Sequence, residues 1–342
     1  MPSDYGYINA RLKGQHSRLL KAGNYEELLN LPDFEAFSKW LDSSPYSREW
    51  QEAQSRFSGL AAAEEALSAS FNSATRLMRR ISEGRPRQLM EVIVRRWDLE
   101  NLKAVIRGLH HRWPAEEILR GVLPAGSLTK VQLAELAGQA DLRDLADTLS
   151  TWGLEWAMPL SRALPEYQNR PDLADLELTM DRYYYYQSLR ELRGLDRDRE
   201  VLREILRREI DLLNVRSIKR LREQGTGTEA RQAAEPGRYY LPGGRLLTLE
   251  KYLALLDPRE SRKAMRSLRG TPLFRLLEGQ EDQEMKDWQE KADAYRGDPL
   301  GIEVAVGFIW RKYFEVANLR LIARGKHFGL PAERIRQQLL VA

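Results

Sequence analysis

A six-residue pattern occurs three times in this chain, at intervals of about one hundred residues. In each copy an acidic residue stands three positions before an asparagine, and an aliphatic and then a basic residue follow it. The copies are DLENLK at residues 98–103, DLLNVR at 211–216 and EVANLR at 315–320. The asparagines lie 113 and 104 residues apart, whereas solenoid repeats run roughly 20–50 residues. The spacing therefore predicts three copies of a small domain.

Further residues recur at fixed distances from the pattern. An arginine follows each asparagine by six positions, at Arg107, Arg220 and Arg324. Upstream, Asp33 with Leu41 resembles Asp141 with Leu149, and residues 41–45 resemble residues 268–272. The landmarks keep the same order throughout, so we divide the chain into repeat units of residues 1–118, 119–232 and 233–342. The middle copy differs most, because residues 224–237 form a polar stretch typical of a flexible loop.

Nearly every segment has the pattern of a helix. Leu, Ala, Arg and Glu dominate, prolines fall between periodic stretches, and no run alternates with a period of two. Asn24 and Thr129 stand three residues before Glu27 and Gln132, which indicates capping boxes at helix starts. Another helix is expected to start at Thr248. The predicted fold class is all-α, with three similar helical domains.

On a helix, the acid and the asparagine of each copy share one face with aliphatic residues, because positions three and four apart are neighbours. One interpretation is that Asn101, Asn214 and Asn318 are buried braces that bind a neighbouring helix terminus and fix helix register. The alternative is that the three asparagines bind a ligand. We favour the brace, since three separate domains rarely keep identical small-molecule sites.

Composition disfavours several kinds of function. The chain has 54 basic and 50 acidic residues, and these alternate instead of forming the basic tracts of a nucleic-acid surface. Four consecutive tyrosines, 183–186, would point in four directions on a helix, about 100° apart, so packing is favoured over a stacking platform for nucleic acid. The N-terminal residues lack the apolar core expected of a signal peptide, and no apolar run approaches the ~20 residues that span a bilayer.

Catalytic and cofactor chemistry have little support in the sequence. There is no cysteine, and the four histidines do not form a metal-binding motif. No phosphate-binding loop of the G-x-x-x-x-G-K-[ST] type occurs. We therefore expect no catalytic, cofactor-binding or metal-ligating residues.

The order of these motifs resembles the C subunit of the V-type and A-type rotary ATPases, known as the d subunit in eukaryotes. The resemblance covers nearly the whole chain. It rests on residues 7–12 with Leu19 and Leu20, on residues 98–103, and on residues 315–322 with Lys326 and residues 329–331. The C-terminal stretch is the most specific to the family.

The resemblance implies a funnel-shaped, non-catalytic protein with three similar domains around a pseudo-threefold axis. It implies a place in the central rotor, where the protein seats the shaft (the D and F subunits) on the ring of proteolipid subunits. There it would transmit torque between ATP hydrolysis or synthesis and proton or sodium transport, peripheral to the cytoplasmic face of the membrane. One mouth of the funnel is expected to be lined by basic residues, including some of Arg107, Arg220 and Arg324.

A different class of protein remains as the alternative. An all-helical scaffold or RNA-binding protein could use three domains to dock separate partners. Nucleic-acid affinity falls steeply with ionic strength, so salt dependence distinguishes the two. A rotor subunit is expected to bind no nucleic acid.

Overall fold

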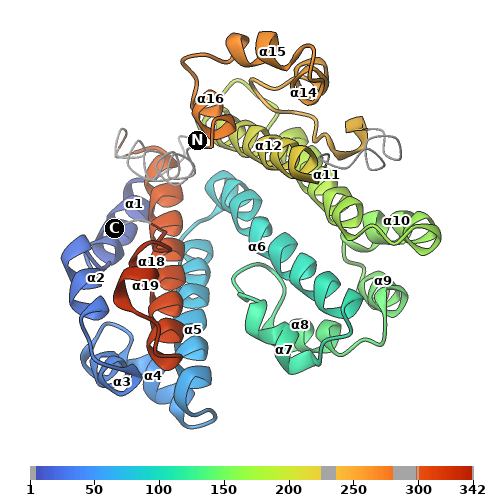
Figure 1. The fold of residues 1–342 in the computed structure, drawn as a ribbon. Coiled ribbons are helices and arrows are strands. Elements are labelled where there is room, and N and C mark those ends of the chain that lie inside the picture. The colour runs from blue at the N-terminus through green and yellow to red at the C-terminus, as the bar shows by residue number, and fades with distance from the viewer. Residues whose placement is uncertain (1–4, 225–235, 280–297, 299, 341–342) are drawn as a thin grey trace. The chain divides into compact units, whose positions relative to one another are not determined.

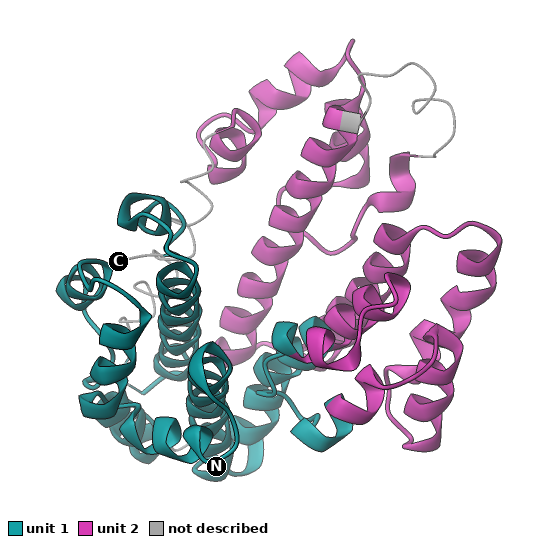
Figure 2. Ribbon diagram, turned by 60° about the horizontal axis from the view of Figure 1, so that its bottom comes forward, with its two compact units in different colours: residues 1–101, 120–133, 288–342 teal, residues 102–119, 134–287 magenta. Residues whose placement is uncertain are grey.

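The computed structural model describes residues 5–224, 236–279, 298 and 300–340, and every regular element within them is a helix (Figure 1). The all-α prediction is therefore confirmed. The chain divides into two compact units (Figure 2). Unit 1 is Met1–Asn101, Arg120–Leu133 and Trp288–Ala342, and unit 2 is Leu102–Leu119 and Ala134–Asp287. The division into three repeat units stays a prediction.

Unit 1 is built around a long, largely apolar helix, α18 (Glu303–His327), which packs against α5 (Gly59–Arg80) and α1 (Tyr5–His16). α18 is buried on several sides, because residues 305–310 are all buried. An aromatic cluster joins its elements, with the rings of Phe71 and Trp97 centred 5.1 Å apart. The remaining helices are α2 (Ala22–Leu29), α3 (Phe34–Ser43), α4 (Ser47–Gln54), α19 (Ala332–Arg336) and the first part of α6 (Gly84–His110).

Unit 2 is organised by two long helices, α11 (Leu173–Glu191) and α12 (Arg197–Gln224), which pack against each other. α10 (Ala157–Asn169) packs on α9 (Leu142–Thr151) and on α11. α12 also contacts α14 (Leu249–Leu256) and α16 (Pro272–Leu277), and α15 (Ser261–Ser267) packs on α14. The shorter elements are α7 (Ala115–Gly121), α8 (Lys130–Ala137) and the 3₁₀ helix η1 (Pro236–Tyr239); α7 and α8 each cross a boundary between the units.

The helix starts predicted at Thr129 and Thr248 are correct, and the recurring aspartates Asp33 and Asp141 also cap helices. The side chain of Asp33 accepts a hydrogen bond from the Ala36 amide, and Asp141 has the same backbone conformation and caps α9. Thr129 and Gln132 form the predicted capping box, with hydrogen bonds of 3.2 and 3.0 Å between side chains and backbone amides. Thr248 caps α14.

The predicted helix start at Asn24 is wrong, because the helix begins before this residue. α2 begins two residues earlier, at Ala22, so Asn24 lies inside its first turn. Its side-chain oxygen accepts from the Lys21 amide at 2.9 Å and supplies the reciprocal half of a cap. The predicted loop 224–237 falls mostly on residues 225–235, which lie outside the described residues. Its last two residues, Pro236 and Gly237, begin η1.

The four consecutive tyrosines divide between the core and the surface of unit 2. Tyr184 and Tyr185 are buried, whereas Tyr186 is 61 % exposed. This is the divergence expected for adjacent helical positions. None of the helices within the described residues combines the length and the apolarity needed to cross a bilayer.

Candidate functional site: three acid–asparagine clamps

The first copy of the repeated pattern binds the chain's own backbone. Asn101 donates to the Leu123 carbonyl at 2.8 Å and accepts from the Leu123 amide at 2.7 Å. Asp98 accepts from the amides of Ser127 and Leu128 at 2.7 and 2.9 Å, and from the Ser127 hydroxyl. One turn of α6 thus holds both ends of the loop that leads from α7 to α8. We call this arrangement an acid–asparagine clamp.

The second copy repeats the clamp on α12. Asn214 donates to and accepts from the backbone of Leu241, both at 2.8 Å. Asp211 accepts from three successive amides, those of Arg245, Leu246 and Leu247. The clamped loop again follows a short helix, here η1.

The third copy also uses a carboxylate and an asparagine, but their backbone partners come from two segments far apart in the sequence. Asn318 accepts from the Leu340 amide, 22 residues further on, the same separation as between Asn101 and Leu123. Glu315 accepts from the amide of Leu20, in the segment between α1 and α2. It also accepts from the Tyr46 hydroxyl and forms an ion pair of 2.9 Å with Lys312. The N-terminal segment therefore occupies the position that a downstream loop holds in the other two copies.

The residues after each clamped amide confirm this correspondence. Each acid binds the amide of a leucine, and the N-cap of a second helix follows that leucine by 13 residues. The buried positions also coincide, at five and eight residues after the leucine. In the first copy these residues are Leu128, the N-cap Asp141 and the buried pair Leu133 and Leu136. In the second they are Leu247, Glu260, Tyr252 and Leu255. In the third they are Leu20, Asp33, Tyr25 and Leu28.

The clamp carboxylates are removed from water. Asp98 and Asp211 are each 1 % exposed and Glu315 is 3 % exposed. Burial raises the pKa of Asp98 and of Asp211, while the backbone amides that they accept from act in the opposite direction. The asparagines are at most 2 % exposed. The asparagines bind loops that follow short helices, and their role as braces stays a prediction.

A glycine completes the clamp in the outer two copies. Gly108 and Gly325 each stand seven residues after the asparagine, and a Cβ at either position would overlap the side chain of Ile118 or Ile335. These isoleucines, 17 residues after the asparagine, belong to the short helices α7 and α19. The middle copy has Leu221 in place of the glycine. The absence of a side chain thus allows the returning helix to lie against α6 or α18.

The three arginines have different surroundings. Arg107 forms a two-point ion pair with Glu177, at 2.6 and 2.7 Å, and Arg324 pairs with Glu64. Arg220 is exposed and lines a hollow of about 300 Å³ between α11 and α12, together with Glu177 and Asn214. The hollow therefore brings Asn214, Arg220 and the partner of Arg107 together within unit 2. Whether the arginines line one mouth of a funnel stays a prediction.

A buried ion pair in unit 2 was not predicted. Lys103, two residues after the first asparagine, binds Asp181 of α11 at 3.0 and 3.1 Å, and both residues are 7 % exposed. The pattern places a basic residue at this position in every copy, but only tertiary structure supplies the acid. Losing one partner of such a pair leaves an uncompensated buried charge.

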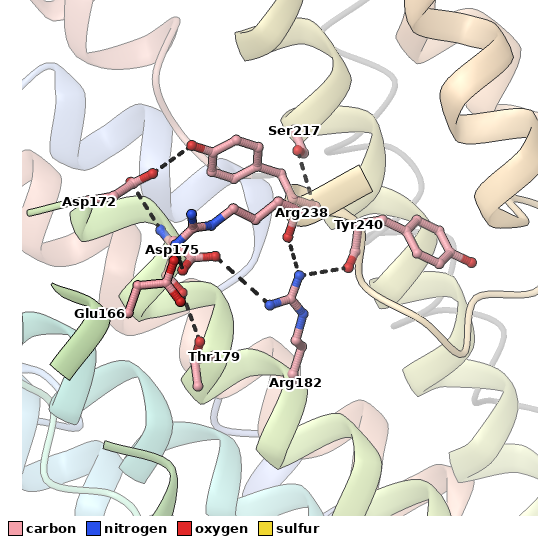
Figure 3. A network of polar contacts seen from close by, with 9 residues as sticks. Glu166, Asp172, Asp175, Thr179, Arg182, Ser217, Arg238 and Tyr240 are labelled. Carbon is pink, nitrogen blue, oxygen red and sulfur yellow. Dashed lines mark hydrogen bonds and ion pairs between the residues drawn. The ribbon is translucent and has the colours of Figure 1, made fainter. Parts of the chain in front are cut away.

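A second polar network holds η1 on α11 (Figure 3). Arg238 pairs with Asp175 at 2.6 Å and with Glu166 at 2.8 Å. The Tyr239 hydroxyl donates to Asp172 at 2.6 Å, and Arg182 donates to the carbonyls of Arg238 and Tyr240. These bonds position the chain just before the clamped Leu241.

In all three copies the prominent polar side chains bind the chain's own backbone, an arrangement typical of a helical structural protein. Residues 8–338 match the family model of the ATP synthase (C/AC39) subunit. The chain therefore belongs to the ATP synthase (C/AC39) subunit family. It is a non-catalytic subunit of a V/A-type rotary ATPase complex, as predicted.

Several curated relatives match almost end to end. The A-type ATP synthase C subunit of Haloquadratum walsbyi is 28 % identical, over 98 % of this chain and 97 % of that protein. The V-type ATP synthase C subunit of Deinococcus radiodurans is 27 % identical, over 99 % of this chain and 92 % of that protein. The V-type ATP synthase C subunit of Thermus thermophilus is 28 % identical, over 99 % of each.

Proposed function

We propose that this chain is the central-rotor subunit that seats the shaft, formed by the D and F subunits, on the membrane rotor ring. It transmits torque between ATP hydrolysis or synthesis and the transport of protons or sodium. The observation that carries the proposal is the clamp: an acid and an asparagine bind loop backbone in three places, and the third pair joins the segments that contain Leu20 and Leu340. A torque coupler needs this kind of internal bracing more than it needs a reactive group.

The repeated clamp supports three similar domains around a pseudo-threefold axis. In the proposed arrangement, the acid and asparagine of each domain hold the start of the next, and those of the last domain hold the start of the first. The repeated helix pairs then begin near Leu20, Leu128 and Leu247. The second and third domains would therefore start 9 and 14 residues after the boundaries predicted at 119 and 233. An arrangement in which each domain is bound to the next, and the last to the first, suits a protein that rotates as one body.

The proposed location is the cytoplasmic face of the membrane, peripheral and held there by the complex. The partners are the proteolipid ring on one side and the shaft on the other. Arg107, Arg220 and Arg324 are candidates for one of these two contacts, and Arg220 and Arg324 are the more exposed of the three. Acidic groups on the facing protein would complement them.

Deleting the chain is expected to uncouple ATP hydrolysis from ion transport. Without it, the ring and the shaft lose their connection, so hydrolysis no longer drives ion movement. The measurement is ATP-driven ion uptake into membrane vesicles, with ATP hydrolysis assayed in parallel. Restoring the gene on a plasmid is the control and should restore uptake. Unchanged uptake per ATP hydrolysed in the deletion strain would contradict the proposal.

A further inference from the structure

Unit 2 contains a hollow whose polar lining is almost entirely arginine. Its volume is about 370 Å³, within the range of small-ligand sites. It lies between the end of α11, the start of α12 and the clamped turn at Pro242 and Gly243. The arginines that line it are Arg182, Arg190, Arg193, Arg203 and Arg207. No carboxylate is among the described lining residues.

Two of the five guanidinium groups are held by backbone carbonyls. Arg203 donates to the carbonyls of Leu192 and Gly194, both at 3.2 Å. Arg182 reaches the carbonyls of Arg238 and Tyr240 (Figure 3). Carbonyl oxygens orient both groups without neutralising them, and Arg182 also has one long ion-pair contact of 3.9 Å with Asp175.

The other three guanidinium groups are exposed. Within the part of the chain that the structure describes, those of Arg190, Arg193 and Arg207 have no hydrogen-bond or ion-pair partner. Glu204, three residues before Arg207 on α12, is already engaged by Arg208 and Arg245. Like charges gathered in one hollow repel, and an anion bound between them relieves that repulsion.

This arrangement differs from other arginines of unit 2. Arg107 and Arg238 each pair with a partly buried carboxylate of the same unit. The planar guanidinium fork binds carboxylate and phosphate oxygens at two points, and arginine clusters are the usual way to bind phosphate groups. Five such groups around a hollow of this size suit a compact ligand of high negative charge.

We propose that this arginine pocket binds a small anion with two or more phosphate groups, such as a pyrophosphate, a nucleoside di- or triphosphate or a multiply phosphorylated lipid headgroup. The half-exposed wall of Leu189 and the exposed ring of Tyr186 give the pocket an apolar side. An aromatic base could stack on that ring, so a nucleotide is expected to bind more tightly than pyrophosphate. The clamp formed by Asp211 and Asn214 fixes the turn that closes the pocket.

Calorimetric titration of the full chain with sodium pyrophosphate and with magnesium-free ATP tests the proposal. The triple variant Arg190→Gln/Arg193→Gln/Arg207→Gln is expected to raise the Kd for pyrophosphate by at least about tenfold, because three charge-assisted contacts are lost. The triple lysine variant keeps the charge but loses the two-point guanidinium geometry, so its Kd should lie between those of the unmodified protein and the triple glutamine variant. Flotation with vesicles that contain a phosphoinositide bisphosphate, against phosphatidylcholine alone, distinguishes a lipid headgroup from a free phosphate.

A matched control removes the same charge elsewhere in unit 2. Arg262, Arg266 and Arg269 are exposed arginines on or just after α15, and none of them lines the pocket. Their triple glutamine variant should change the Kd by less than about twofold, apart from the general effect of net charge. If the chain bound the phosphoinositide vesicles but neither pyrophosphate nor ATP, and the triple glutamine variant of the pocket abolished that binding, the ligand would be a lipid headgroup. Absence of binding to every probe, or an equal loss in the control variant, would overturn the proposal.

Discussion

Replacing Asp98 by alanine is expected to lower the free energy of unfolding by about 2–4 kcal/mol. The buried Leu128 amide loses its acceptor at about 1–3 kcal/mol, and two half-buried bonds from Ser127 are lost as well. The donors are the amides of Ser127 and Leu128 and the Ser127 hydroxyl, all bound to this carboxylate at 2.7–2.9 Å. The desolvation that raises the pKa of Asp98 offsets part of the loss, since a costly buried charge is also removed. Urea unfolding followed by far-ultraviolet circular dichroism measures the change.

The control for this substitution is Glu100→Ala. Glu100 lies on the same helix, two residues further on, and is exposed. Its replacement should change stability by no more than about 0.5 kcal/mol. The destabilisation by Asp98→Asn should lie between those of Asp98→Ala and Glu100→Ala, because the amide keeps one acceptor oxygen. If Asp98→Ala were no more destabilising than Glu100→Ala, the clamp would not hold the loop.

Replacing Gly325 by alanine is expected to destabilise the protein by about 2–3 kcal/mol, although alanine is the better helix former. The new methyl group would overlap Ile335 and force α19 away from α18. That shift also strains the bond between the Leu340 amide and Asn318. Thermal unfolding and amide exchange of residues 331–340 would report the global and the local effect.

The same substitution at Gly14 is the matched control. Gly14 lies in the exposed face of α1, with nothing within 4 Å of its missing Cβ. Gly14→Ala should therefore stabilise the protein by about 0.5–1 kcal/mol. Shortening the opposing side chain, as Ile335→Val, should recover part of the loss at Gly325. Effects of the same sign at both glycines would contradict the proposed contact.

The sequence predicts the local parts of this fold well. Helix caps such as Thr129 and Thr248 bind amides three positions away, so their pattern is visible in the chain. Asn24 shows the limit of such patterns. Its side chain binds backwards to the Lys21 amide, and the helix starts before it. Both roles use the same residue types, and the local pattern does not distinguish them.

The partners of the clamp could not be predicted in the same way. Asn101 binds a backbone 22 residues away and Glu315 one 295 residues away, and backbone groups carry no sequence signal. The repeat nevertheless indicated buried braces, because three polar pairs set into apolar helix faces must find partners. The glycine seven residues after two of the asparagines was a signal that only the packing against Ile118 and Ile335 explains.

The most direct test of the rotor assignment is a pull-down with the intact chain as bait. The purified D–F pair and the detergent-solubilised ring are offered separately and then together. We expect the chain to retain each one alone and both at once, and charge reversal at Arg107, Arg220 and Arg324 to weaken one of the two contacts. Retention of neither the shaft nor the ring would contradict the assignment.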